Sequence, residues 1–164
     1  MFREMRRFKQ VLSKEECIQV LNRGTNGVLA VIGDDGYPYT VPLSYCYCDS
    51  KIYFHSAKAG HKIDALEKND KVSFCVVDAD NIVPEKFTTY FRSVIVFGKA
   101  RVLRDEEKRF ALELLIDKYS KEFSNNKEAE ISGSFNAVSC IELIIEHMSG
   151  KEAIEYIREK ESNN

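Results

Sequence analysis

Six segments of the sequence have the residue pattern of β-strands, and few helical segments separate them. Each is rich in β-branched and aromatic residues or alternates between apolar and polar positions. They span residues 28–32, 37–47, 52–57, 72–77, 90–103 and 137–146. A doubly wound parallel sheet needs a helix at nearly every crossover, which this order does not supply. The sequence therefore predicts a mainly β fold with flanking helices, in which six antiparallel strands curl into a closed or nearly closed barrel.

The residues between these segments predict how the strands connect. The Gly-Asp-Asp-Gly turn at 33–36 and the Asp-Ser pair at 49–50 join the first three strands, which we expect to form a meander. Residues 80–90 have mixed charge and predict a loop, and Gly98 predicts a bulge or bend within its strand. Residues 120–134 are rich in Ser, Asn, Lys and Glu and predict a mobile polar connection.

Helices are predicted at four places. Ser13 and Glu16 form a capping box that begins the first helix. The others are a short helix at residues 63–66, a strong one at 105–119 and a short charged one after Gly150.

Composition favours a soluble globular protein. We expect a single domain over residues 1–164 because domains usually contain about 100–200 residues. The 24 basic and 26 acidic residues give a net charge of −2, which argues against a nucleic-acid partner. No apolar run reaches the roughly 18–20 residues that span a membrane, and no secretion signal begins the chain. We therefore expect a cytoplasmic protein without a membrane partner.

The five cysteines predict thiols and not a disulfide framework, because their number is odd and most lie in apolar segments. Cys46 and Cys48 share one face of a predicted strand. No adjacent pair of histidines completes the ligand set of a zinc site, so we expect no metal.

Residues 52–62 place a polar, cationic turn between a strand and a helix. Gly60 tolerates a positive φ and lets backbone amides approach a ligand, the helix start adds unpaired N–H groups, and Lys62 adds a full charge. Ser56 could add a hydroxyl. This local chemistry predicts an anion site suited to phosphate, and its alternative is an ordinary loop with a solvated lysine.

Several short motifs follow one another in order over residues 5–150. They are Met5-Arg6-Arg7, Gly27-Val28-Leu29-Ala30, the ten residues from Gly36 to Tyr45, the run Ile52 to Ala57 with Gly60 and Lys62, and the run Ser93 to Ala100. Their order and spacing resemble the FMN-binding split-barrel family that includes pyridoxamine 5′-phosphate oxidase, and more closely its nitroimidazole-resistance branch. The resemblance implies a homodimer with FMN at the interface, where both subunits line each site.

The resemblance also implies which residues bind the cofactor. The isoalloxazine ring would lie along Val41, Pro42, Leu43 and Ser44, and the pocket would continue with His55, Ser56 and Ala57. The phosphate would be held by the turn of Gly60, His61 and Lys62. From the partner subunit, the flavin would be approached by Ser93 and Val94.

His55 is the candidate catalytic residue. Histidine can give or accept a proton near neutral pH, so His55 could orient the substrate or protonate a reduced product. Its alternative is a half-buried histidine bonded to a backbone carbonyl. Arg6 and Arg7 either fold back onto the cofactor or are surface charges, and the sequence leaves both readings open.

The resemblance implies an FMN-dependent oxidoreductase of the nitroimidazole-reductase kind. An external small-molecule donor would reduce bound FMN, which would pass electrons to a small organic acceptor such as a nitroaromatic compound. The alternative is a non-catalytic FMN- or haem-binding protein of the same fold. The chain has Glu142, Glu146 and His147 where the oxidase has basic substrate-binding residues, so we do not expect vitamin B6 oxidase activity.

Overall fold

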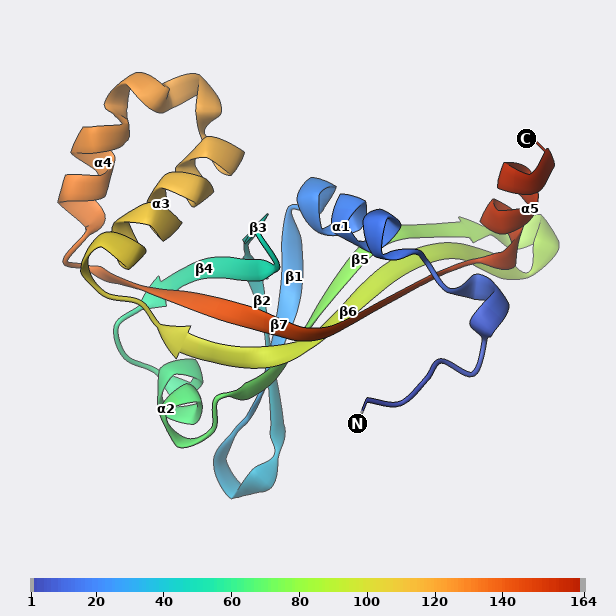
Figure 1. The fold of residues 1–164 in the computed structure, drawn as a ribbon, viewed down its shortest axis with the longest axis horizontal. Helices are drawn as coiled ribbons and strands as arrows, with labels where there is room; N and C mark the ends of the chain where they lie inside the picture. Colours follow the sequence, from blue (N-terminus) through green and yellow to red (C-terminus); the bar gives the residue numbers. More distant parts are fainter. Residues whose placement is uncertain (1, 163–164) are drawn as a thin grey trace.

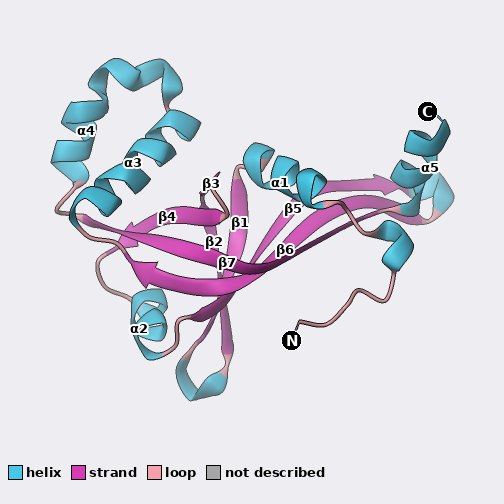
Figure 2. Cartoon of the chain, viewed as in Figure 1, coloured by secondary structure: helices cyan, strands magenta, loops and turns pink. Residues whose placement is uncertain are grey.

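The computed structural model describes residues 2–162, except for the side chain of Ser124. This part of the chain contains one antiparallel sheet of seven strands with five α-helices around it (Figures 1 and 2). The strands are β1 (Asn26–Ile32), β2 (Pro38–Ser44), β3 (Cys46–Cys48), β4 (Lys51–Ala57), β5 (Lys71–Val83), β6 (Thr88–Val102) and β7 (Val138–Glu152). The helices are α1 (Lys14–Arg23), α2 (His61–Lys68), α3 (Asp105–Tyr119), α4 (Lys127–Ser134) and α5 (Ile154–Ser162). None of the helices in this range has the length and apolar content needed to cross a membrane.

The sheet has seven strands and not the predicted six, because the strand expected at residues 37–47 is divided at Tyr45. The hydrogen-bonded order is β2-β1-β5-β6-β7-β4-β3, so the two parts of that segment lie at opposite ends of the order. The predicted β1–β2 hairpin is confirmed. The predicted turn at Asp49-Ser50 is confirmed, since it joins β3 to β4. The meander is wrong for the longer part of the segment, because β2 does not pair with β4, whose other neighbour is β7.

The hydroxyl of Tyr119, at the end of α3, holds the break at Tyr45. It accepts a hydrogen bond from the Tyr45 N–H at 2.9 Å and lies 2.8 Å from the Tyr45 carbonyl and 2.5 Å from the Thr25 carbonyl. The Tyr45 side chain is fully buried, and its own hydroxyl donates to the Leu21 carbonyl at 2.8 Å. The backbone polar groups at the break are therefore bonded to α3 instead of a neighbouring strand.

The sheet curls around one core because a single residue joins β2 to β3. The two ends of the strand order are thereby brought together, and β2 runs close to β4 without pairing with it. Apolar side chains of β1, β4, β5, β6 and β7 fill the interior with side chains of α1 and α2. The result is a split barrel whose circuit of hydrogen bonds is open between β2 and β4.

The predicted loop at 80–90 is mostly a continuation of the β5–β6 hairpin. The two strands pair from Lys71 opposite Lys99 to Val83 opposite Thr88, which leaves only residues 84–87 as the turn. This part of the hairpin projects from the curled sheet and is largely exposed, so it lacks the alternation that identifies a half-buried strand (Figure 1). The predicted bulge at Gly98 is confirmed by a register shift against β7.

A second bulge, next to Asp78, forms an ion-pair site that ties α1 to the hairpin. The Asp78 carboxylate lies 2.5 Å from Arg23 of α1 and 3.2 Å from Arg92 of β6. Arg92 also contacts the buried Glu152 at 2.9 Å. Burial raises the pKa of Asp78, but the two guanidinium groups outweigh it, so this pKa lies below its ordinary value.

The segment 120–134 is helical and not the expected polar connection. A 3₁₀ turn, Lys121–Asn126, leads into α4, which folds back on α3. Ion pairs join the two helices, with Arg109 2.5 Å from Glu128. Ile131 is buried in a second apolar cluster with residues of β4, β7 and α3. This single anchor, within a polar sequence, gives α4 its place over one end of the sheet.

The local signals for the other helices are confirmed. The capping box is complete: the Ser13 hydroxyl accepts from the Glu16 N–H at 3.1 Å, and the Glu16 carboxylate accepts from the Ser13 N–H at 2.8 Å. The strong helix spans the predicted residues, and a short helix follows the last strand.

We predict that Tyr119→Phe destabilises the protein by about 1–3 kcal/mol, because it leaves the buried Tyr45 N–H without its partner. Urea denaturation of both proteins measures the difference. Tyr37→Phe is the matched control, since Tyr37 is 75% exposed and should change stability very little. Equal stability of Tyr119→Phe and wild type would show that this hydroxyl does not hold the break.

Candidate functional site

Two strand edges lie beside each other at the split between β2 and β4. One edge of β2 pairs with β1, and one edge of β4 pairs with β7 along its whole length. On its other edge β4 pairs with β3 only as far as Cys46 opposite Tyr53. Continuing that register would place Ser44 opposite His55, but no strand of the described chain pairs there. Backbone N–H and C=O groups at such edges need partners, which a ligand with a polar rim can supply.

Side chains of β2 alternate between the core and the exposed face of the strand. Val41 and Leu43 pack against the core, whereas Pro42 and Ser44 are exposed. Pro42 has no N–H to donate, and such a residue is tolerated at a free sheet edge. The predicted ring-binding strand therefore presents backbone, the proline ring and the Ser44 hydroxyl.

The predicted pocket residues of β4 have different surroundings. His55 and Ala57 are exposed, whereas Ser56 is buried and its hydroxyl donates to the Ala57 carbonyl at 2.7 Å. His55 is thus the ionisable side chain of this strand that faces the open space. The Ser56 hydroxyl is already used by the backbone as a donor and can only accept from a ligand.

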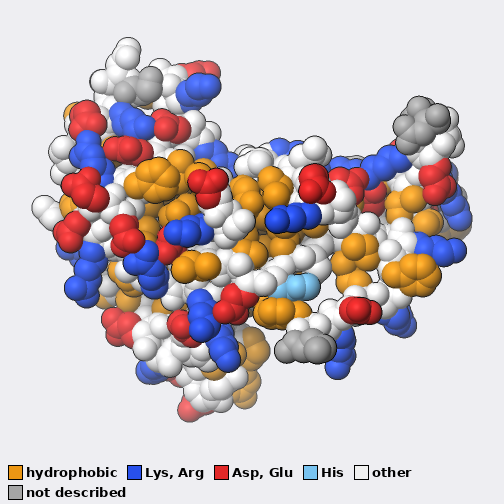
Figure 3. Space-filling model, viewed as in Figure 1, with side chains coloured by type: hydrophobic (Ala, Val, Ile, Leu, Met, Phe, Trp, Pro, Cys, Tyr) orange, Lys and Arg blue, Asp and Glu red, His pale blue; other side chains and the backbone are white. Residues whose placement is uncertain are grey.

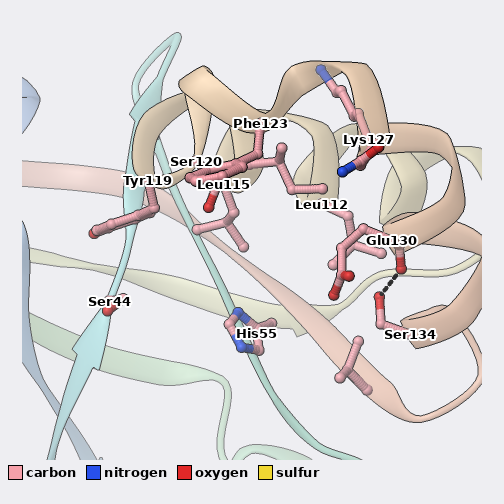
Figure 4. A pocket seen from close by; sticks show the side chains of 13 residues that line it. Ser44, His55, Leu112, Leu115, Tyr119, Ser120, Phe123, Lys127, Glu130 and Ser134 are labelled. Carbon is pink, nitrogen blue, oxygen red and sulfur yellow. Dashed lines mark hydrogen bonds between the residues drawn. The ribbon is translucent and has the colours of Figure 1, made fainter.

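A cavity of about 660 Å³ lies between Ser44 and His55 on the sheet and the helical segment 112–134 (Figure 4). The helical segment supplies apolar and polar wall residues in roughly equal number. They are Leu112, Leu115, Ile116, Tyr119, Ser120, Phe123, Asn126, Lys127, Glu130 and Ser134, with Val138 at the start of β7. The sequence does not predict this part of the wall, because residues 120–134 are mostly polar and indicate a connection. The apolar Phe123 and Ile131 in that polar stretch were the available signal.

The turn before α2 has the features predicted for an anion site. Gly60 has φ = 131°, in the left-handed region that glycine tolerates, and its carbonyl accepts from the N–H groups of Ile63 and Asp64 at 2.8 and 3.1 Å. No side chain caps this helix start, so its first N–H groups have no intrahelical partner. Lys62 is in the first turn and forms no ion pair within residues 2–162.

His61 is directed away from this turn, towards the β1–β2 connection. Its ring stacks on Tyr39 with 4.2 Å between ring centroids, and its Nε2 lies 3.7 Å from the carboxylate of Asp34. Of the polar groups of His61, only the backbone N–H is therefore available to an anion at the helix start.

Ser93 and Val94 lie apart from the other predicted residues of the same chain, and their predicted approach to the partner's flavin stays a prediction. Both lie on β6, and neither lines the cavity. Val94 is fully buried in the core of its own chain, so its side chain cannot reach a ligand. Arg6 and Arg7 line a different cavity, of about 350 Å³, against Ile154 of α5.

Contacts within the fold are made by the three residues that stand where the oxidase has its basic substrate-binding residues. Glu142 is buried and accepts from Lys51 at 3.0 Å and from Arg101 at 2.7 Å. Glu146 lies 4.0 Å from Lys99, and the His147 ring stacks on Phe2. Within residues 2–162, no three His, Cys, Asp or Glu side chains gather to hold a metal ion, and all five cysteines are free.

Comparison with known proteins gives a family and a set of similar structures. The family model for pyridoxamine 5′-phosphate oxidase matches residues 13–152. A candidate 5-nitroimidazole antibiotic resistance protein of Bacteroides thetaiotaomicron is 25% identical, with a TM-score of 0.73, covering 87% of this chain and 86% of its own. An FAD-binding protein of Mesorhizobium loti is 29% identical, with a TM-score of 0.65, covering 88% and 97%.

A third structure, an FAD- and haem-binding protein of Mycobacterium smegmatis, is 22% identical with a TM-score of 0.72, covering 88% of this chain and 73% of its own, and shows a likeness of fold alone. No curated protein matches the sequence significantly. The family predicted from the order of the motifs is confirmed. With its split antiparallel sheet and a family match over residues 13–152, the chain belongs to the pyridoxamine 5′-phosphate oxidase family.

Proposed function

We propose that this protein binds FMN in the split between β2 and β4 and reduces a small organic acceptor, as a nitroimidazole reductase does. The observation that carries the proposal is the pair of free strand edges at Ser44 and His55, followed along the chain by the uncapped start of α2. Proteins of similar structure support a flavin: the Mesorhizobium loti protein, 29% identical, binds FAD.

The chain's own groups fit the two ends of FMN. Backbone groups of residues 41–44 and 54–57 would bond the polar rim of the ring, and the exposed Ser44 hydroxyl would add a donor. A terminal phosphate carries nearly two negative charges, which suit a helix start and a lysine. Gly60 and Lys62, at the start of α2, would hold that end. We assign FMN because the family resemblance implies that this turn holds a terminal phosphate.

Bound FMN would supply the electron transfer itself. His55 would orient the acceptor or deliver a proton to its reduced form, because His55 and the apolar helical wall line the same cavity. The apolar side chains of that wall would help to exclude water from the acceptor.

A second copy of the chain would complete the site as a homodimer. Strand pairing places Val28 and Ile95 in one row on the outer face of the sheet, with Phe97 and Val77 in adjacent rows, and each is at least 38% exposed. The helices α3 and α4 cover another part of the sheet. Figure 3 shows apolar side chains over the strands that lie between these two helices and the N-terminal segment. Contiguous exposed apolar surface of this kind marks an interaction site. Ser93 would approach the partner's flavin from this face.

Turnover is the direct test of the enzyme proposal. Protein loaded with FMN should oxidise NADH or NADPH, directly or through a flavin reductase, only when a nitroimidazole is present. Removing the FMN should abolish the reaction. Bound FMN that no donor or reductase reduces would instead support the alternative, a protein that binds FMN or haem without turnover.

Lys62→Ala should weaken FMN binding by about 1.5–3 kcal/mol and riboflavin binding far less, because only FMN has the phosphate. Calorimetric titration of both ligands measures the two losses. Lys71→Ala, an exposed lysine after the same helix, is the control. Equal losses for FMN and riboflavin would place Lys62 outside the phosphate site.

Ile95→Lys should convert the dimer to a monomer, because it places a charge within the apolar outer face. Analytical ultracentrifugation measures the change. Phe110→Lys makes the same kind of substitution on exposed surface of α3 and should leave a dimer. A wild-type chain that sediments as a monomer with FMN bound refutes the proposed interface.

A further inference from the structure

Glu130 is an acidic side chain in the helical wall of the cavity. It comes from α4, and its carboxylate is directed into the cavity on the side of His55 (Figure 4). Its backbone carbonyl accepts from Ser134, but its carboxylate forms no ion pair or hydrogen bond with the described residues. The neighbouring Glu128, by contrast, is paired with Arg109 of α3.

The basic side chain of the same wall does not neutralise Glu130. Lys127 donates to the carboxylate of Asp117 at 2.8 Å, which balances its charge within the helical hairpin. The cavity therefore has one unbalanced carboxylate on a wall that also carries aliphatic and aromatic side chains, among them Leu115 and Phe123.

We propose that Glu130 selects the acceptor: the cavity takes flat aromatic compounds that carry a positive charge, with the cation at Glu130 and the ring against the apolar wall. The inference rests on the proposed function in one respect, since it treats this cavity as the acceptor's place beside the flavin. Apolar walls accommodate a ring of any charge, so the selectivity comes from the carboxylate. An anionic ring meets repulsion at the same position.

Three compounds with one nitroaryl body and different charge test this selectivity. They are 4-nitrobenzylamine, which is a cation, 4-nitrobenzyl alcohol, which is neutral, and 4-nitrobenzoate, which is an anion. Calorimetric titration should show the amine binding about fivefold more tightly than the alcohol, as expected for a partly exposed ion pair. The benzoate should bind more weakly than the alcohol.

Glu130→Gln should reduce the affinity for the amine to that for the alcohol and leave the alcohol unchanged. Glu122→Gln removes the same charge from an exposed position outside the cavity wall and should keep the wild-type order. An unchanged preference for the amine in Glu130→Gln would overturn the proposal, and so would equal affinities in the wild type or no binding of the amine.

Titrations of the protein with and without FMN separate this inference from the proposed function. Charge selectivity in a protein that fails to bind FMN would overturn the flavin assignment and keep the role of Glu130 as a selector of cations. FMN-dependent turnover without charge selectivity would overturn the role of Glu130 and keep the flavin assignment.

Discussion

The hydrogen bonds between the Tyr119 hydroxyl and the backbone of Tyr45 are the constraint on which the architecture depends. Without this break, the strand would continue in the register that begins with Cys46 opposite Tyr53. β2 and β4 would then satisfy each other's edges and close the barrel. With the break, β2 turns to pair with β1 alone, and two unpaired edges lie beside each other. The break therefore leaves the sheet open between β2 and β4, where the candidate site lies.

The same helix that holds the break also builds the wall of the cavity. Tyr119 is the last residue of α3, and α3 with α4 covers the space in front of Ser44 and His55. The stability of the break and the shape of the cavity are therefore linked through one helical hairpin. Ion pairs between its two helices, and the buried Ile131, hold the hairpin together.

Local signals in the sequence were sufficient for the features that short-range interactions determine. The capping box at Ser13, the helix 105–119 and the glycine turn at Gly60 were predicted because their causes lie within a few residues. The break at Tyr45 was not, because the side-chain alternation continues through it and its partner lies 74 residues away. The β5–β6 extension was missed because its exposed strands show no alternation.

In the candidate site, too, some features follow from local sequence signals and others from contacts between distant segments. Ser44, His55, Gly60 and Lys62 were identified from motifs along the chain, whereas the wall that contains Glu130 depends on the packing of one buried isoleucine in a polar segment. For Val94, which is predicted to approach the partner's flavin, strand alternation places the side chain in the core of its own chain. The helical wall depends on long-range packing, which the local sequence pattern does not reveal.

The absorption spectrum and mass of the ligand that copurifies with the full chain test the central claim most directly. The free edges of β2 and β4 with the uncapped start of α2 predict a flavin spectrum and the mass of FMN. A Soret band without flavin absorption would contradict the account, and a ligand with the mass of FAD would contradict the assignment of the α2 turn to a terminal phosphate.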